Sequence, residues 1–268
     1  MHYIMQLIMK IILITTLISI LLSANVSAGT DGENNFSKNS KHVKDCFENL
    51  NRATFSLNQD LDKAIFKPIA KTYRALPSPV RTGTSNVLEN ISSLITIPNN
   101  ILQGDFKIAG INTGRFVVNT TVGVLGIFNV AEKMNFPEYV KEDYGQTLGA
   151  WGVGAGCYFV LPVLGPTTVR DTTGSFVNAL GGDPYYNVST HGNNEYLTTT
   201  QYATTKFLTG VDFRAKNLET IDNLEKNSLD FYASVRSLYL QDRQRKISNK
   251  NAIIEVLYEG DWTEIDNK

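Results

Sequence analysis

Apolar residues recur at helical spacing over most of the chain between residues 47 and 246. The clearest case is the series Val87, Leu88, Ile91, Leu94 and Ile95, which predicts an amphipathic helix that starts near Pro79 and ends at Pro98. The same spacing predicts helices over residues 47–69, with a kink or break at Pro68; over 108–117; and over 207–246, with a break at 227–228 and Ser228 as the cap of the last helix. The pattern indicates a mostly α fold, a single domain built from amphipathic helices.

Residues 122–128 interrupt this pattern with a short apolar run that contains Gly123 and Gly126. Glycine weakens both helices and strands, so neither is favoured here. Two interpretations stay open at this stage. The run is either a hairpin or hinge, or a buried connection between two helices.

The two ends of the chain differ from its middle. Residues 1–28 combine Lys10, an apolar run at 11–22 and the small-residue end Val26-Ser27-Ala28, which predicts a secretory signal with the mature chain starting near Gly29. An uncleaved anchor is the alternative, but the run is shorter than the roughly 20 residues that a span needs. We expect flexible residues at 29–45, the domain at 46–246 and a tail at 247–268. No later segment has 18 uninterrupted apolar residues, which disfavours a single-pass protein.

Composition and charge exclude some functions. The chain has 268 residues, 42% of them hydrophobic, which is enough for one well-filled domain. Its 25 basic and 26 acidic residues give a net charge of -1, so it lacks the basic field that holds a nucleic acid backbone. Cys46 and Cys157 are the only thiols, and a disulfide between them is one interpretation for an exported chain. We favour unpaired thiols, because Cys46 follows a segment predicted to be flexible.

The sequence also lacks the residues that common catalytic sites require. Of its three histidines only His191 is a candidate base, and no G-x-S-x-G motif places a serine opposite it. The glycines near residue 150 are not followed by the rest of a nucleotide-binding motif and instead suggest a tight loop or a close helix contact. Cysteine and histidine are too few for a transition-metal site. We therefore expect no catalytic residues, no cofactor and no metal.

Residues 142–171 carry the most distinctive motif of the chain, EDYGQTLGAWGVGAGCYFVLPVLGPTTVRD. This stretch resembles the VacJ family, also called MlaA, whose usual form is E-D-F-G-Q-T-L-G-x-W-G-V-G-x-G-P-Y-x-V-L-P-x-L-G-P-S-x-x-R-D. Cys157 replaces the family's proline and Thr167 its serine. Four further blocks occur in the family's order: residues 51–62, 77–81, 102–123 and 228–241. The resemblance covers roughly residues 45 to 246.

The resemblance implies a helical ring embedded monotopically in the inner leaflet of the Gram-negative outer membrane. Members of the family maintain lipid asymmetry, so the implied function is removal of mislocalised phospholipids from the outer leaflet and their transfer to a periplasmic lipid carrier. The expected partners are phospholipid, the membrane, a trimeric porin and that carrier. Family members usually carry an acylated cysteine directly after the apolar run. This chain has no cysteine there, so we expect attachment at the periplasmic face of the outer membrane without that anchor.

A lipid path needs an apolar route for the acyl chains beside a polar route for the headgroup, because each methylene group exposed to water costs about 0.8 kcal/mol. The residues expected to form the channel wall and a movable hairpin come from two stretches. They are Gly123, Gly126, Phe128, Gly152, Gly154, Gly156, Tyr158, Leu161 and Pro162. Arg115 and Arg170 lie in family blocks and are candidates for headgroup contacts, although a structural ion pair or helix-end bond is the favoured interpretation. The alternatives are a cell-envelope phospholipase or acyltransferase, and a structural envelope protein that moves no lipid.

Overall fold

The computed structural model describes residues 43–178, 182–190 and 199–248, which belong to one compact unit beginning at Val43. Its helical elements are α2 (Glu48–Leu61), the π-helical turn η1 (Asp62–Phe66), α3 (Lys67–Arg74), α4 (Ser78–Leu102), α5 (Phe106–Thr121), α6 (Val130–Lys133), α7 (Tyr144–Ala150), α8 (Val169–Val177), α9 (Pro184–Thr190), α10 (Thr199–Lys216), α11 (Leu218–Asn227) and α12 (Phe231–Ser248). Strands β1 (Tyr158–Leu161) and β2 (Gly165–Thr168) form one antiparallel hairpin. The mostly α prediction is confirmed. The predicted signal, His191 and most of the predicted tail lie outside the described residues.

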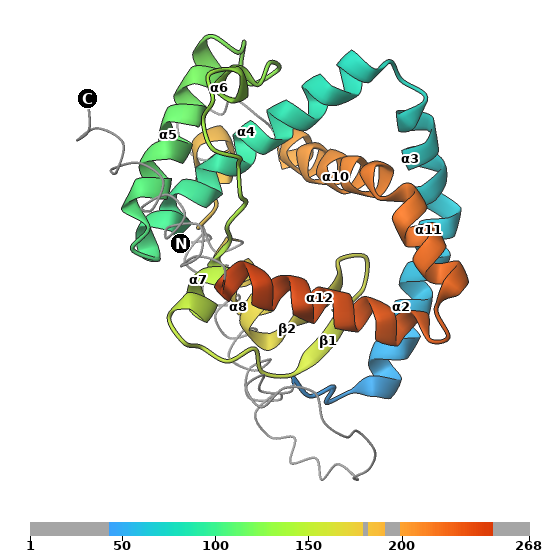
Figure 1. The fold of residues 1–268 in the computed structure, drawn as a ribbon. Coiled ribbons are helices and arrows are strands. Elements are labelled where there is room, and N and C mark those ends of the chain that lie inside the picture. Colours follow the sequence, from blue (N-terminus) through green and yellow to red (C-terminus); the bar gives the residue numbers. More distant parts are fainter. Residues whose placement is uncertain (1–42, 179–181, 191–198, 249–268) are drawn as a thin grey trace, which may run out of the picture. The chain divides into compact units, whose positions relative to one another are not determined.

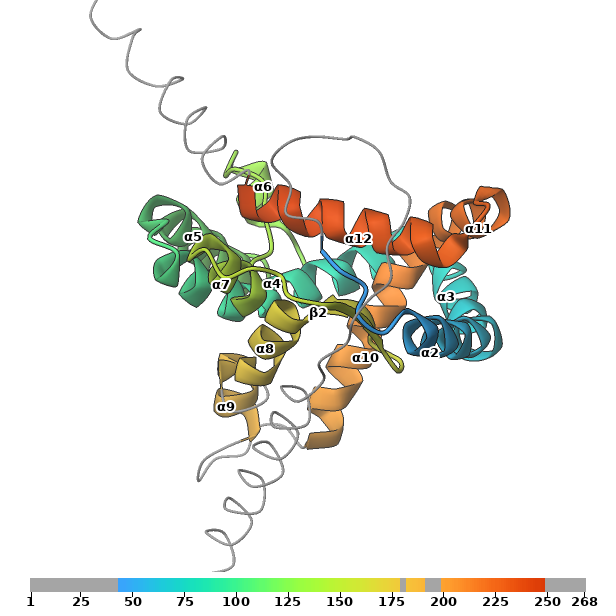
Figure 2. The same ribbon diagram turned by 90° about the horizontal axis from the view of Figure 1, so that it is seen from below.

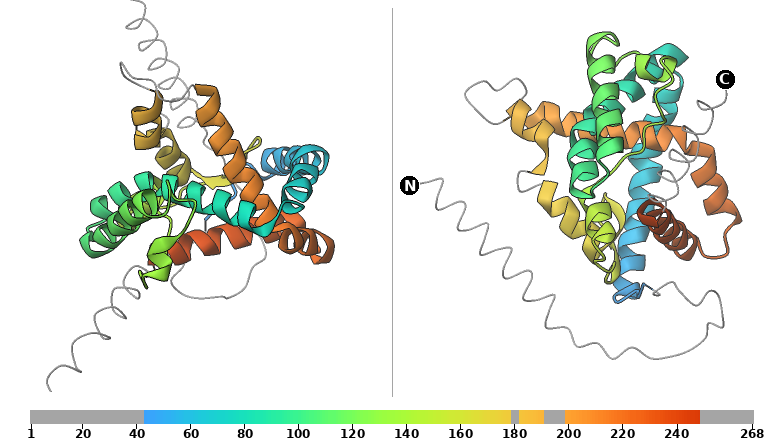
Figure 3. Two further views of the ribbon diagram at one scale, coloured as in Figure 1. Left: turned by 90° about the horizontal axis from the view of Figure 1, so that it is seen from above. Right: turned by 60° about the vertical axis from the view of Figure 1, so that its left-hand side comes forward.

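The helices of this unit form a ring. Contacts run from α3 to α10, on to α4, α7, α12 and α11, and from α11 back to α3. Figure 1 shows α4, α3, α11, α12 and α7 as successive sides of this ring. Helices α8 and α9 and the first half of α10 extend to one side of it (Figures 2 and 3). In the described part of the chain, no helix has the length and apolarity that crossing a membrane requires.

Helix α4 is longer than the apolar spacing predicts. Pro79 lies in its first turn as expected, but the helix continues through Pro98 to Leu102, so the prediction that Pro98 ends it is wrong. A proline removes one intrahelical hydrogen bond, and in α4 the side chain of Asn99 donates to the carbonyl of Ile95 at 2.8 Å in the same turn. Pro98 therefore costs the helix one hydrogen bond without ending it.

The irregularity expected near Pro68 is confirmed. Helices α2 and α3 run into each other through the π-helical turn η1, and Pro68 occupies the first turn of α3. Arg214 of α10 donates to both carboxylate oxygens of Asp62, at 2.8 and 2.9 Å, which fixes the wide turn against α10.

The C-terminal helices differ from the prediction in their boundaries. The chain breaks at Asn217 as well as at 228–230. Ser228 ends α11, where its hydroxyl donates to the carbonyl of Leu224 at 2.6 Å, so its prediction as the cap of the last helix is wrong. Asp230 caps α12 instead, because its carboxylate accepts the amide of Ala233 at 3.0 Å. Sequence spacing identified the break but not which polar residue caps it.

The β hairpin forms part of the main apolar core. Tyr158 of β1 is fully buried and packs with Phe55, Val160 and Tyr232. Asn51 of α2 holds the strand edge, since its side chain donates to the carbonyl of Tyr158 at 3.2 Å and accepts the amide of Val160 at 3.0 Å. A second small cluster, formed by Ala70, Ala215 and Leu218, joins α3, α10 and α11.

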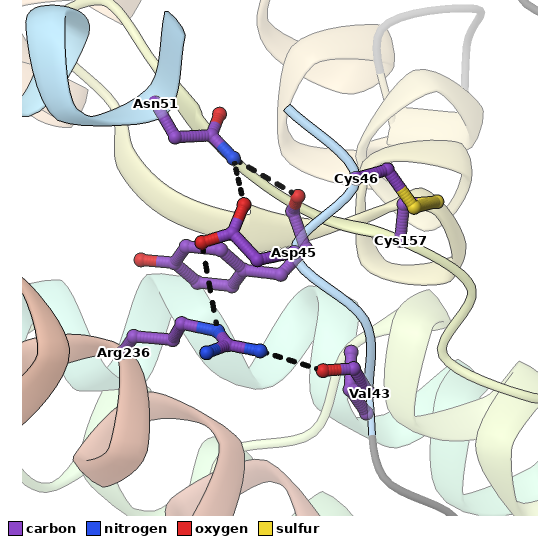
Figure 4. Close-up of a disulfide and its surroundings, with 7 residues drawn as sticks. Val43, Asp45, Cys46, Asn51, Cys157 and Arg236 are labelled. Atoms are coloured by element: carbon purple, nitrogen blue, oxygen red, sulfur yellow. Dashed lines mark hydrogen bonds and ion pairs between the residues drawn. A yellow bond between two sulfur atoms is a disulfide. The ribbon is translucent and has the colours of Figure 1, made fainter. Parts of the chain in front are cut away.

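Cys46 and Cys157 form a disulfide, so the expectation of unpaired thiols is wrong (Figure 4). Residues 43–45 are not loose: the amide of Tyr158 donates to the carbonyl of Lys44 at 2.9 Å, and Asp45 pairs with Tyr158 as a parallel β-bridge. Arg236 of α12 donates to the carbonyl of Val43 at 2.7 Å. These bonds hold Cys46 beside β1, with its Cα 5.6 Å from that of Cys157, which is a normal disulfide separation.

Candidate functional site

The interface of α4, α5 and α7 is built from polar side chains. Asn112 of α5 donates to Asn100 of α4 at 2.9 Å, and Thr147 of α7 donates to Asn99 at 2.6 Å. The buried polar residues of α4 and α5 are Ser85, Asn90, Ser93, Thr96, Asn99, Asn100, Asn112, Arg115 and Asn119. Small and polar residues that bond across helix interfaces are typical of helices packed in an apolar medium.

Many of the large apolar residues of this region are exposed, although Leu88 and Ala109 are buried. Phe106 is 69% exposed at the start of α5, Val122 is 66% exposed at its end, and Leu125 is 71% exposed in the following turn. Across the unit, exposed large apolar residues also include Val117, Val124, Ile127, Phe128, Trp151, Val163, Leu164, Val169, Phe176 and Phe213. A buried polar interface beneath an apolar surface is the reverse of the usual arrangement in water, where apolar residues form the core.

Residues 122–128 form a tight turn between α5 and α6. The amide of Phe128 donates to the carbonyl of Gly123 at 2.9 Å, and the amide of Gly126 donates to the carbonyl of Asn119 at 2.8 Å. A Cβ on Gly123 would lie 2.3 Å from the carbonyl oxygen of Phe128, and Gly126 has a φ of +91°, so both positions require glycine. Because Phe128 and Leu125 are exposed, the interpretation as a buried connection is wrong; the run is an exposed turn from α5 to α6, and its role as a hinge stays a prediction.

The second predicted stretch divides into exposed and buried parts. Gly152 and Gly154 have no heavy atom within 4 Å of an added Cβ, whereas Gly156 packs against Val169 of α8. A close helix contact is therefore found for Gly156 but not for the other two. Tyr158 lies in the core, Leu161 is half-buried and Pro162 is exposed. The tip of the β hairpin is also apolar and exposed at Val163 and Leu164, and the side chain of Asn58 of α2 accepts the amide of Val163 at 2.7 Å.

The two candidate arginines are buried. Arg115 donates to the carbonyl of Pro137 at 2.8 Å and to the side chain of Asn129 at 3.4 Å. Arg170 forms an ion pair with Asp171 at 3.0 Å. Both side chains are 7% exposed or less. Their observed contacts are those of structural residues, the interpretation that the sequence favours.

A buried ion cluster joins α12 to α7 and α8. Arg243 of α12 donates to both oxygens of Asp143, at 2.6 and 2.9 Å, and to Asp171 at 2.8 Å. Burial opposes ionisation of Asp143, but the hydrogen bonds and charge of Arg243 outweigh it and lower the pKa of the carboxyl. Burial likewise opposes the charged form of Arg243, yet the two carboxylates raise its pKa. All three groups stay charged at neutral pH, and their ion pairs keep α12 in contact with α7 and α8.

Sequence reasoning missed two features. The first is the polar stripe on α4, because apolar spacing shows that a helix has two faces but does not show which one is buried. The second is the disulfide between Cys46 and Cys157, for which the two cysteines of the sequence were the only available signal.

Comparisons with known proteins all point to one family. The family model described as MlaA lipoprotein matches residues 43–246. The chain is 34% identical over 202 residues to the intermembrane phospholipid transport system lipoprotein MlaA of Escherichia coli strain K12, covering 74% of this chain and 76% of that protein. It is 33% identical over 210 residues to a protein of Rickettsia bellii, covering 77% and 78%. A solved structure from work on the structural basis for maintenance of bacterial outer membrane lipid asymmetry matches with a TM-score of 0.66 and 32% identity, covering 76% of this chain and all of that one.

Proposed function

The chain belongs to the MlaA lipoprotein family, and from that premise we propose that it transports phospholipid between membranes and so maintains the lipid asymmetry of the outer membrane. Phospholipids that reach the outer leaflet leave it through the ring and pass to a soluble carrier in the periplasm. The protein forms and breaks no covalent bond in this process. It provides a path on which the acyl chains avoid water and the headgroup avoids hydrocarbon.

The observation that best supports this proposal is the inverted distribution of side chains on α4, α5 and the turn at 122–128. In water, Phe106, Val122 and Leu125 together would expose a large apolar surface. Within a lipid leaflet the same residues face hydrocarbon, while the polar side chains of α4 and α5 bond to each other. The ring therefore lies in the inner leaflet of the outer membrane, monotopically and from the periplasmic side.

The lipid path in this proposal uses the exposed members of the predicted site. Pro162 leaves open surface at the apolar tip of the β hairpin, where Leu164 is 79% exposed, and Gly152 and Gly154 leave open surface in the segment before β1. In Figure 1 the turn between β1 and β2 rises behind α12 toward the space that the ring surrounds. Acyl chains contact this tip. Tyr158, Arg115 and Arg170 are buried beneath this surface, so they support it and do not contact lipid.

The turn at 122–128 is the movable element of the path. Its only side-chain hydrogen bond from α4 in the described structure runs from Asn86 to the carbonyl of Ile127 at 2.9 Å. Substitution of Asn86 by alanine should therefore speed amide hydrogen exchange of Leu125 and Phe128, while exchange in α5 stays unchanged. Equal exchange in both proteins would mean that the turn is held by its backbone bonds alone.

Partners follow from the location. A trimeric porin serves as the scaffold in the membrane, and a periplasmic lipid-carrier protein receives the phospholipid. Copurification of the chain from detergent-solubilised outer membranes, followed by mass spectrometry, tests both. Recovery of the chain with neither a porin nor a carrier would contradict these two partners but would not contradict the transport proposal.

The transport proposal is tested by complementation of a Gram-negative strain that lacks its own member of the family. Phospholipid in the outer leaflet is measured as the lysophospholipid released when phospholipase is added to intact cells. The chain should lower this release, and Leu125→Asp should not, because a carboxylate would replace the most exposed apolar side chain of the turn. Aspartate accepts the left-handed φ of +56° at this position, so the turn itself is retained. Leu229→Asp, at a fully exposed position between α11 and α12, is the matched control.

Failure of the unsubstituted, membrane-located chain to lower the release would contradict transport. Release of fatty acid by the purified protein itself would instead favour an envelope phospholipase.

A further inference from the structure

Two asparagines of α2 bond to the backbone of the β hairpin in the same way. Asn51 and Asn58 are seven residues apart, which places them on one side of the helix about two turns from each other. The side chain of Asn51 donates to the carbonyl of Tyr158 and accepts the amide of Val160. A carbonyl and the amide two residues later are the two groups that one residue of a neighbouring parallel strand binds. Asn51 therefore takes the place of a strand residue beside β1.

Asn58 repeats this pattern at the end of β1, where the chain turns. Its side chain donates to the carbonyl of Leu161 at 2.9 Å and accepts the amide of Val163 at 2.7 Å. Strand pairing ends at Leu161 and Gly165, so the hairpin tip consists of residues 162–164. Within the described residues, no other side chain forms a hydrogen bond with the backbone of the tip. Asn58 is thus the side-chain link between α2 and the tip.

The backbone of the tip is strained at Val163. Its φ is +66°, in the left-handed region, where a β-branched residue is a rare outlier because its side chain crowds the backbone. The amide of Leu164 donates to the carbonyl of Pro162 at 2.7 Å, and a bond of this span around a residue with positive φ is the rare, strained form of the γ-turn. Such a conformation persists only where its surroundings favour it over relaxed alternatives. The bond from the amide of Val163 to Asn58 supplies that preference.

We propose that Asn58 is the positioning residue of the hairpin tip, which holds Val163 in its strained conformation and so fixes where Val163 and Leu164 meet the acyl chains of a phospholipid. In this conformation Val163 is 60% exposed and Leu164 is 79% exposed. The contact with acyl chains rests on the transport function proposed above, whereas the hold on the tip rests on the hydrogen bonds of Asn58. Without Asn58 the tip relaxes, and a lipid loses a contact that was fixed in place.

Amide hydrogen exchange of the full chain in a nonionic detergent tests the hold on the tip. Asn58→Ala removes the acceptor of the Val163 amide, so exchange at Val163 should become at least about fivefold faster. Asn58→Asp keeps an acceptor oxygen for this amide, and exchange should stay within about threefold of that in the unsubstituted chain. Asn217→Ala is the matched control, because the side chain of Asn217 donates to the nearby carbonyl of Phe213 and not to the hairpin. Unchanged exchange at Val163 in Asn58→Ala would overturn the proposal.

Photo-crosslinking to lipid tests what this hold achieves. A photoreactive apolar amino acid replaces Leu164, or Leu125 as the internal control, and the protein is irradiated with vesicles of phosphatidylethanolamine and phosphatidylglycerol. With Asn58→Ala, lipid capture at Leu164 should fall at least about twofold, because the strained turn is no longer the favoured conformation, while capture at Leu125 stays the same. Equal losses at both positions would mean that Asn58 acts through folding or membrane binding, and its positioning role would be wrong.

Two results separate the role of Asn58 from the transport proposal. If the chain with an intact Asn58 captures no lipid at Leu164, but Asn58→Ala still speeds exchange at Val163, the hold on the tip is supported and the proposed lipid path is contradicted. If lipid is captured equally at Leu164 with and without Asn58, the lipid path is supported and the positioning role is refuted.

Discussion

Removal of the disulfide should destabilise the fold strongly, because the bond closes a long loop. Cys46 and Cys157 are 111 residues apart in the sequence. In the chain-entropy description, a loop of this length restricts the denatured chain by about 5 kcal/mol. The hydrogen bonds that hold residues 43–45 to β1 and α12 remain in the folded state. Loss of the disulfide therefore acts mainly by raising the conformational entropy of the denatured chain. We expect the Cys46→Ser/Cys157→Ser variant to lose about 3 to 5 kcal/mol of unfolding free energy, or roughly 6 to 20 °C in Tm.

The measurement is urea denaturation followed by circular dichroism, without reductant, after mass spectrometry of unreduced peptides has verified the bond. The unsubstituted chain in reductant is the matched control, since it should unfold with the double variant. A difference below about 1 kcal/mol between the oxidised chain and the variant would refute the loop-closure reasoning. A difference that persists in reductant would assign the effect to side-chain packing around Cys46.

Three further predictions concern the ion cluster, the turn and the apolar surface. Arg243→Gln should cost about 2 to 3 kcal/mol at pH 7, because Asp143 loses the guanidinium that binds both of its oxygens, while Asp171 keeps its ion pair with Arg170. The pKa of Asp143 is lowered in the folded state, so this stabilisation is present above the unfolded carboxyl pKa and is lost as pH falls; the cost of the substitution in urea melts should therefore shrink between pH 7 and pH 3.5, and a constant cost would contradict the pairing. Gly126→Ala should cost about 1 to 2 kcal/mol because of its positive φ, whereas Gly110→Ala, with open space at its Cβ, should be neutral or slightly stabilising; equal melting temperatures would contradict the strain. Phe106→Asp should reduce flotation of the protein with phospholipid vesicles, Phe106→Leu should not, and unchanged flotation in both would show that this face does not contact lipid.

Local physics explains the parts of the fold that the sequence predicts well. Helical spacing located α4, α5 and the C-terminal helices, because residues three and four positions apart lie on one face of a helix. Pro68 marked the irregularity between α2 and α3 through its missing amide. The glycines at 123 and 126 marked an interruption of regular structure, since glycine weakens both helices and strands.

The candidate site was predicted only in part. Gly123, Gly126 and Phe128 do form one compact turn, and Gly152, Gly154 and Pro162 are exposed. Tyr158 occurs in the same motif, yet its side chain fills the core, because alternate residues of a strand point to opposite faces. A motif therefore identified the segment without separating the residues that line a surface from those that support it.

The sequence by itself determined the helical character, the position of the main turn and the family, since each depends on residues that are close together in the chain or on their order. Tertiary structure alone decided which face of α4 is buried and whether Cys46 meets Cys157. Periodicity shows that two faces of a helix differ, but the medium on each side determines which one turns inward. Contacts between residues a hundred positions apart depend on how the helices close into a ring, and no local pattern encodes that distance.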